Sequence, residues 1–415
     1  MATRSTPPAE ANASNKYLVP FIIVTALFGI FGFLTNLNSN LSPKLQDIFS
    51  LNHAMSNLVT TAWFFAYLVF SVPSAKLIEK VGYKRTMVTS LFIMVAGALL
   101  FIPAANMISF PVFLTASFVL ATGVCALQTS ANPYVSILGP ESSAPARLTL
   151  AQAFNSLGSA VAPIIVGAFI LTDSSKKMSQ MEVAHTVIGP YVAIAVSLLV
   201  LGFIVMFLHL PAITATRDFR PAKDGDALAG RSIWTYRHTV LGMGGLFFYV
   251  GVEIALAANA IKFFNAQGVT APHTAALLAS FYMFAIMIGR FAGTVVMKYV
   301  RANHLLTILG FLGVALMLLA MVTSGQVAVW CLILCGLANS IMYPTIFALG
   351  IAELGPLTSK GSGVLTIGNV GGAVIPPLFG LMVDSFSWQF AFVLPIICYL
   401  YVAFYGFNGY KPTKA

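Results

Sequence analysis

The chain has 415 residues, of which 58% are hydrophobic and only 8% are charged, and its mean hydropathy is +0.88. A soluble domain carries roughly 25% charged residues, so this composition cannot form a hydrated surface around a chain of this length. The formal net charge is +10, but the basic residues form no stripe interleaved with aromatics, which argues against a nucleic-acid partner. The composition therefore argues against a soluble enzyme, a disordered protein or a disulfide scaffold, and predicts a protein solvated mostly by lipid.

Apolar runs of about 20 residues, the length that crosses a bilayer as a helix, recur along the whole chain. Glycine and proline interrupt several of these runs, which membrane helices tolerate because neighbouring helices satisfy the freed backbone groups. We therefore expect an all-α membrane protein with twelve transmembrane helices in two pseudo-symmetric six-helix bundles. The predicted spans are 18–41, 53–79, 85–104, 108–137, 146–172, 185–209, 235–265, 272–300, 303–323, 327–353, 360–384 and 386–408.

Lysine and arginine are distributed unevenly between the two ends of the predicted spans. If the N-terminus is cytoplasmic, the outer segments hold only Lys44, Lys176, Lys177 and Lys262. The inner segments hold all the other bases except Lys76 and Arg290, with Lys360 among them. The positive-inside rule then places both termini in the cytoplasm of a multi-pass protein of the cell (inner) membrane. Residues 1–17 lack the basic start and cleavage site of a signal peptide and are predicted to be a disordered cytoplasmic tail.

The longest polar stretch divides the predicted spans six and six. It predicts an N-terminal six-helix bundle over 18–210, a cytoplasmic linker over 211–234, a C-terminal six-helix bundle over 235–408 and a short cytoplasmic tail over 409–415. Two six-helix repeats around a midplane cavity are the architecture of many secondary transporters.

The two halves also repeat one another in sequence. Asn155 in the fifth span and Asn369 in the eleventh each precede a proline by eight positions, with glycine and other small residues between. Pro133 near the end of the fourth span corresponds to Pro344 in the tenth. These matches support an internal duplication.

The segment AKLIEKVGYKR at 75–85 resembles the signature G-x-L-a-D-r-x-G-r-k between helices two and three of the major facilitator superfamily, with Ala75 and Glu79 in place of the first glycine and the aspartate. Four further segments together look like the fucose:proton symporter family, whose relatives include glucose/galactose transporters. The resemblance covers nearly the whole chain and implies a sugar carrier that works by alternating access. The four segments are Asn36-Leu37-Asn38, Gln128 to Tyr134, Leu138 to Ser143, and Leu150 to Ser156.

Two positions depart from the fucose symporters. The resemblance implies an aspartate and a glutamate where this chain has Ser39 and Gln128, neither of which exchanges a proton in the physiological range. Some sugar-transporting members, including sodium-linked ones, have an acid in helix seven shortly after a Tyr-Val-Gly. Here Tyr249-Val250-Gly251 is followed two positions later by Glu253, so the chain resembles that branch.

Glu253 is the acid that the sequence places deep within a span. A charge at bilayer depth costs at least ~2.5–3.5 kcal/mol, so its presence needs a reason. We expect Glu253 to couple transport by taking up a proton or by binding Na⁺ transiently; the alternative is a neutral glutamic acid hydrogen-bonded between helices. Arg290 in the eighth span is either a ligand for a polar substrate or a lock between two helices. We expect no resident metal and no cofactor, with Na⁺ or H⁺ only as a co-substrate.

Neutral polar side chains within the spans form the candidate sugar site. Amides donate and accept hydrogen bonds without a fixed charge, which suits a neutral polyol, and an aromatic ring can stack on a sugar. The alternative is that such residues hold the helices together. The candidate substrate-binding residues are Asn36, Asn38, Gln128, Asn132, Gln152, Asn155, Asn259, Tyr282, Asn339 and Asn369.

Glu79 and Arg85 in the predicted inner loop are candidate gate residues. In the resembling superfamily, the matching acid and base tie the two halves together while the carrier faces outward. The alternative for Arg85 is a topological role as one of the inside bases.

The sequence thus predicts a secondary active transporter that imports a neutral monosaccharide, a hexose of the glucose, galactose or fucose type, by symport with Na⁺ or H⁺. A facilitative sugar uniporter and a polyspecific drug or solute exporter are alternatives. The sequence contains no Ser-His-Asp arrangement, metal cluster or phosphate loop of the kind that would predict an enzyme. We expect a monomer whose partners are the sugar and the lipid bilayer.

Overall fold

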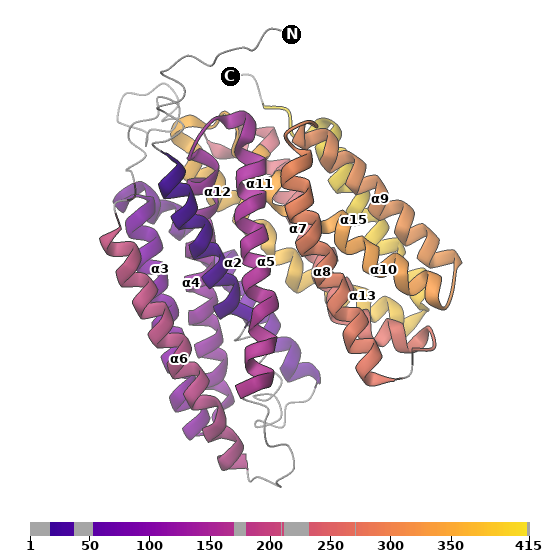
Figure 1. The fold of residues 1–415 in the computed structure, drawn as a ribbon, viewed down its shortest axis with the longest axis horizontal. Helices are drawn as coiled ribbons and strands as arrows, with labels where there is room; N and C mark the ends of the chain where they lie inside the picture. Colours follow the sequence, from indigo (N-terminus) through magenta and orange to yellow (C-terminus); the bar gives the residue numbers. More distant parts are fainter. Residues whose placement is uncertain are drawn as a thin grey trace.

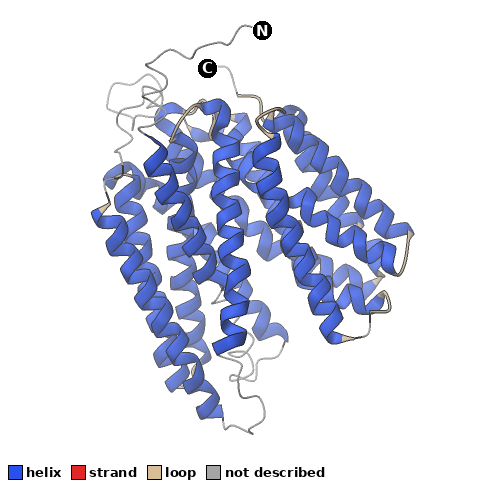
Figure 2. Ribbon diagram, viewed as in Figure 1, coloured by secondary structure: helices blue, strands red, loops and turns tan. Residues whose placement is uncertain are grey.

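The protein is a bundle of long helices (Figure 1), and none of the drawn elements is a strand (Figure 2). Every element in the described part of the chain is a helix, which confirms the predicted all-α class. The structure, a computed structural model, describes residues 17–36, 53–169, 180–208, 210, 232–269 and 271–412, with the backbone alone at 53–58, 163–169, 180–187 and 272. The predicted site residue Asn38 lies outside the described residues.

Six long helices form the N-terminal half of the molecule. Their bounds are Tyr17–Asn36 for the first helix, α2 (His53–Val81), α3 (Tyr83–Asn106), α4 (Phe110–Ile137), α5 (Ala144–Phe169) and α6 (Gln180–Phe207), with the short helix η1 (Glu141–Ser143) before α5.

The C-terminal half has more elements because several of its helices are interrupted. Its elements are η2 (Ile233–Thr235), α7 (Arg237–Ala266), α8 (Pro272–Val296), α9 (Ala302–Val322), α10 (Gln326–Asn339), α11 (Met342–Gly350), η3 (Gly355–Leu357), α12 (Thr358–Ile367), η4 (Gly368–Val370), α13 (Gly371–Ser385), α14 (Trp388–Ala391), α15 (Val393–Phe404) and the π-helical turn η5 (Tyr405–Gly409).

Eleven helices in the described ranges, counting α10 with α11, η3 to α13, and α14 to η5 as one each, are long and apolar enough to cross a membrane. The predicted fifth span, α5, is more polar in its described part, where it carries Arg147, Gln152 and Asn155. α5 lies in the middle of the molecule, between the two halves (Figure 1).

The predicted span 327–353 is divided into α10 and α11, which the sequence did not predict. Pro344 has no backbone N–H, and its ring conflicts with the carbonyl group four residues earlier, that of Ser340. The helix accordingly ends at Asn339 and resumes at Met342. The break leaves the carbonyl oxygen of Ser340 free to accept a hydrogen bond from a side chain.

Close backbone contact joins one helix pair in each half. A Cβ atom on Gly158 would lie 1.9 Å from the carbonyl oxygen of Gly29, so α5 packs directly on the first helix. A Cβ atom on Gly371 would lie 1.8 Å from the carbonyl oxygen of Phe247, so α13 packs in the same way on α7. Glycines in the two repeated segments therefore allow close backbone contact in both halves, although the contacts lie one position apart in the repeat, because Gly158 corresponds to Gly372.

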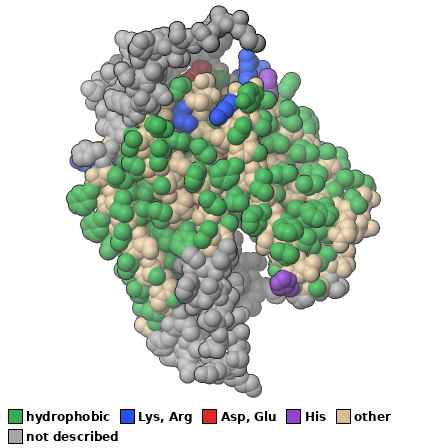
Figure 3. Space-filling model, in the orientation of Figure 1, with side chains coloured by type: hydrophobic (Ala, Val, Ile, Leu, Met, Phe, Trp, Pro, Cys, Tyr) green, Lys and Arg blue, Asp and Glu red, His purple; other side chains and the backbone are tan. Residues whose placement is uncertain are grey.

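The two halves converge at the end of the molecule that carries both termini and diverge toward the other end (Figure 1). In the space-filling view the surface is hollowed between the halves at that far end, and the visible Lys and Arg side chains gather near the termini (Figure 3). Within the described part of the chain, the molecule is therefore closed at the terminal end and hollowed at the opposite end (Figure 1 and Figure 3).

Candidate functional site

A cavity of about 460 Å³ lies between the two halves, with walls from the first helix, α5, α7 and α8. A cavity of this size is typical of sites for small molecules. Its described lining combines amides, serines, one carboxylate and one guanidinium with a patch of apolar side chains. The lining residues are Asn36, Asn155, Ser156, Ser159, Ala160, Glu253, Ser280, Met283, Phe284, Ile286, Met287 and Arg290.

Glu253, the predicted coupling acid, lies near the middle of α7 in the wall of this cavity. Its carboxylate is within electrostatic range of the Arg290 guanidinium and of the phenol groups of Tyr249 and Tyr282. The two phenols are neutral donors, so Arg290 is the positive charge that faces this acid from the described helices.

Two of the predicted sugar ligands, Asn36 and Asn155, line the cavity. Asn155 also donates a hydrogen bond from Nδ2 to the carbonyl oxygen of Phe28 at 3.0 Å, and Ser159 donates from Oγ to that of Gly32 at 3.1 Å. These polar side chains thus hold the first helix against α5 and also border the cavity.

Asn132 and Gln152 form one hydrogen-bonded chain across the two halves. The Gln152 Nε2 atom donates to Asn132 Oδ1 at 3.5 Å, and the Asn132 Nδ2 atom donates to the phenol oxygen of Tyr343 at 3.4 Å. All three side chains are buried. A sugar would therefore reach these amides only after the contacts between α4, α5 and α11 have opened.

Gln128 forms a second chain across the halves. Its Oε1 atom accepts hydrogen bonds from Tyr67 Oη at 3.3 Å and from Asn369 Nδ2 at 3.4 Å. The sequence singled out both amides but neither Tyr67 nor Tyr343. Tyr343 stands next to the repeated Pro344, which is the signal that could have drawn attention to it.

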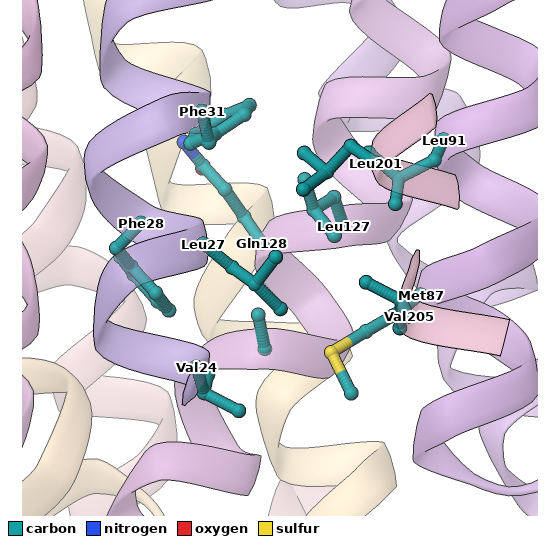
Figure 4. A pocket seen from close by; sticks show the side chains of 11 residues that line it. Val24, Leu27, Phe28, Phe31, Met87, Leu91, Leu127, Gln128, Leu201 and Val205 are labelled. Carbon is teal, nitrogen blue, oxygen red and sulfur yellow. The ribbon is translucent and has the colours of Figure 1, made fainter. Parts of the chain in front are cut away.

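Gln128 also borders a smaller pocket inside the N-terminal half (Figure 4). The side chains that line this pocket are otherwise apolar and come from the first helix, α3, α4 and α6. A sugar needs many polar partners, so the larger cavity between the halves is the better candidate site.

Tyr282, Asn339 and Asn259 do not line the larger cavity. Tyr282 Oη accepts a hydrogen bond from Asn339 Nδ2 at 2.8 Å and donates to the backbone carbonyl of Glu253 at 3.4 Å. Asn259 donates to the carbonyl oxygen of Ala255 in its own helix. Tyr282 and Asn339 therefore brace α8 against α10 and α7 around the coupling acid.

The predicted gate residue Glu79 faces the C-terminal half at the closed end. Its Oε1 atom accepts a hydrogen bond from Ser359 Oγ at 3.2 Å and lies 3.9 Å from Lys360 Nζ. Arg85 is exposed at the start of α3. The base opposite Glu79 is thus Lys360, for which the sequence predicted only an orienting role.

Two further contacts that sequence reasoning missed close this end. Ser362 Oγ donates at 2.6 Å to the carbonyl oxygen of Thr129, an oxygen that lacks its helical partner because Pro133 stands four residues later. Glu141 Oε1 accepts from the backbone N–H of Glu353 at 2.9 Å. The repeated proline was the visible signal for the first contact.

Two helical halves that enclose a polar cavity, with contacts closing one end and an opening at the other, define a secondary transporter of the alternating-access class. Comparison with known proteins agrees, since the family model of the Major Facilitator Superfamily matches residues 22–367. A glucose/galactose transporter of Brucella abortus is 39% identical over 408 residues, which are 97% of each chain. An L-fucose-proton symporter of Escherichia coli is 32% identical over 94% of this chain and 93% of its own.

A solved structure of the superfamily transporter FucP in the outward conformation covers 95% of this chain and 99% of its own, with a TM-score of 0.83 and 31% sequence identity. The chain belongs to the major facilitator superfamily and, within it, to the family of the fucose symporters and glucose/galactose transporters. The predicted family and fold are thereby confirmed, and the protein is a transporter rather than an enzyme.

Proposed function

We propose that this protein imports a neutral hexose of the glucose, galactose or fucose type together with H⁺ or Na⁺. The observation that carries the proposal is the cavity between the halves, in which one carboxylate stands among amides and serines. Relatives named as glucose/galactose transporters and L-fucose-proton symporters support the sugar class.

The cavity offers the partners that a pyranose needs. Asn36, Asn155 and Ser159 supply donors and acceptors for ring hydroxyls. Phe284 on α8 supplies an aromatic surface for the apolar face of the ring. A neutral sugar fits this lining better than an anion, because Arg290 is the one cation among the described lining residues and is already hydrogen-bonded.

Coupling follows from the cost of moving a bare charge through a low-dielectric barrier. With H⁺ or Na⁺ bound, Glu253 and its ligand are neutral, and the loaded carrier can reorient. Without the cation, the carboxylate opposes reorientation with sugar alone. The sugar therefore crosses only together with the cation.

We further propose that the chain is a monomer in the cell (inner) membrane, with residues 18–210 and 235–408 as its two bundles and both termini in the cytoplasm. The bases gathered near the termini support this orientation (Figure 3). The open end then faces outward, and the likeness to FucP in its outward conformation supports this state.

Uptake by proteoliposomes tests the proposal. Purified protein is reconstituted, and labelled glucose, galactose and fucose are supplied under an imposed Na⁺ or proton gradient. We expect one cation gradient to drive accumulation of at least one of these sugars above its external concentration. If neither gradient does so while sugar still equilibrates, the protein is a uniporter.

The variant Glu253→Gln tests the coupling residue. It should abolish gradient-driven accumulation and retain exchange of internal for external sugar, because a permanently neutral side chain mimics the loaded state. The exposed acid Asp384 on α13 supplies the control, since Asp384→Asn should accumulate sugar as the unaltered protein does. Normal accumulation by Glu253→Gln would remove Glu253 from the mechanism.

A further inference from the structure

We propose that Arg290 is the positioning residue that links the charge of Glu253 to closure of the cavity floor. The proposal rests on the proposed function, in which Glu253 carries the transported cation. In this role Arg290 binds neither the sugar nor the cation. It makes the contact that keeps the empty carrier shut at the terminal end.

The break between α10 and α11 fixes one side of the Arg290 guanidinium. Pro344 cannot donate to the carbonyl oxygen of Ser340, and Arg290 Nε donates to that oxygen at 3.2 Å. The end of α10 also carries the negative pole of its helix dipole, which favours a cation there. Arg290 is thus anchored within the C-terminal half by a carbonyl that the proline has released.

The other side of the guanidinium reaches across to the N-terminal half. Arg290 Nη1 donates to the carbonyl oxygen of Gln152 at 3.1 Å and to the hydroxyl of Ser156, both on α5. Arg290 is only 8% exposed, and both Ser156 and Arg290 line the cavity. One side chain therefore joins α8, the α10–α11 break and α5 at the floor of the site.

Glu253 supplies the counter-charge that makes this position favourable. Hydrogen bonds to carbonyl groups satisfy the donors of a buried guanidinium but leave its net charge uncompensated. Glu253 and Arg290 line the same cavity without a direct ion pair between them, and the other titratable groups near Glu253 are the neutral phenols of Tyr249, Tyr282 and Tyr343. The anionic form of Glu253 thus holds Arg290 at the floor.

Neutralisation of Glu253 by H⁺ or Na⁺ removes this attraction. The contact from Arg290 to α5 then weakens, and α5 can separate from α8 at the closed end. The empty carrier, with Glu253 charged, remains shut there. Arg290 thereby makes opening of the floor conditional on the cation, so that sugar without the cation does not cross.

Accessibility of a reporter cysteine tests this. Ser362→Cys places a thiol on a side chain that is fully buried in the closed seam, and the four native cysteines are buried and free. The rate of reaction with a polar maleimide, after subtraction of the rate of the parent protein, then reports how often the floor opens. It is measured with and without the cation that the uptake assay identifies.

We expect the cation to raise the labelling rate in the reporter background. Arg290→Gln should raise the rate without the cation by about tenfold, as expected for the loss of charge-assisted hydrogen bonds, and should abolish its dependence on the cation. Glu253→Gln should have the same effect. The double variant should exceed neither single variant, because the two residues act as one unit.

Three further variants separate this role from simple structural support. Arg290→Lys keeps the charge but cannot reach all three acceptors, so it should raise the basal rate and retain cation dependence. Ser156→Ala leaves Arg290 in place and should give a smaller effect in the same direction, which keeps the test usable if Arg290→Gln does not fold. Arg301→Gln, at an exposed arginine before α9, should label as the parent reporter does.

The outcomes distinguish this proposal from the proposed function. A folded Arg290→Gln that stays slow to label and cation-dependent would overturn the role of Arg290, even if gradient-driven uptake and its loss in Glu253→Gln are observed. If uptake is not gradient-driven but Arg290→Gln still labels rapidly, the symport proposal fails and Arg290 is only a lock between helices.

Discussion

At the scale of single residues, Gln128 joins both halves through one amide oxygen. Tyr67 donates to that oxygen from the N-terminal half and Asn369 from the C-terminal half. An amide accepts these bonds whatever the proton or sodium concentration. This contact is therefore independent of the coupling cation. The contact that Arg290 makes with α5, in contrast, is proposed to depend on the charge of Glu253.

Replacement of Gln128 should measurably weaken the closed form. Gln128→Leu leaves the Asn369 amide and the Tyr67 hydroxyl without an acceptor, so we expect the free energy of unfolding to fall by about 1–3 kcal/mol. Chemical denaturation in detergent measures the change. Gln128→Glu retains an acceptor and should lose less. Equal stability of Gln128→Leu and the unaltered protein would contradict the role given to these bonds.

The sequence predicted which polar residues matter better than it predicted what each one faces. It indicated Glu253, Asn36 and Asn155, which line the cavity. The amides Asn132 and Asn339 are instead fully buried in contacts between helices. A polar residue within a span is costly in either setting, so periodicity and composition cannot separate a ligand from a helix-to-helix contact.

At the scale of elements, repeated glycines set how closely helices approach. Gly371→Ala would bring a Cβ atom to 1.8 Å from the carbonyl oxygen of Phe247, which forces α13 away from α7. We expect a clear fall in melting temperature in detergent. A Cβ atom on Gly380, in the same helix, would meet no other atom within 4 Å, so Gly380→Ala should be neutral or slightly stabilising. A Gly371→Ala protein as stable as its control would refute the close contact.

Prolines in repeated positions release carbonyl groups that other elements then use. Pro133 frees the Thr129 oxygen for Ser362, and Pro344 frees the Ser340 oxygen for Arg290. Hydrophobic patterning predicted the spans but not these freed carbonyl groups, because apolarity is continuous across both prolines. The repetition of the prolines was visible in the sequence, whereas the donors that meet the freed oxygens come from distant helices.

Replacing one of these prolines by a residue with a backbone N–H group should disturb the side chain that uses the freed carbonyl oxygen. Pro344→Ala supplies an N–H group that competes for the Ser340 oxygen, so Arg290 loses its anchor within the C-terminal half. We expect faster labelling of the Ser362→Cys reporter without the cation. In an Arg290→Gln background the same proline change should add little. A large additional increase there would mean that the proline acts through a different contact.

At the scale of the whole molecule, the closed end is held by several weak contacts. The Glu79–Lys360 pair is half-exposed, with exposed fractions of 32% and 40% for the two side chains, and its charges are 3.9 Å apart. Such pairs contribute about 0–1 kcal/mol. Small-residue packing of Gly363 against Ala75, the Ser362 hydrogen bond and the Arg290 contacts therefore carry most of the closure.

Loss of the ion pair should consequently have a small effect. Lys360→Gln is expected to raise the labelling rate of the Ser362→Cys reporter by no more than about fivefold, the equivalent of about 1 kcal/mol. High salt should reproduce part of that increase in the unaltered pair, because salt screens exposed charges. An increase larger than that caused by Arg290→Gln would reverse the ranking of the two contacts.

The polarity of α5 affects how the chain is inserted into the membrane during synthesis. A helix with a basic residue and several amides partitions poorly into lipid by itself. Arg147 at its start donates to the carbonyl oxygens of Val135, Ser136 and Pro140, at and just after the end of α4. During synthesis, α4 is therefore the first surface able to take up this charge, and the two helices are best inserted as one hairpin. A helix that borders the transport cavity is thus also one whose entry into the bilayer depends on its neighbours.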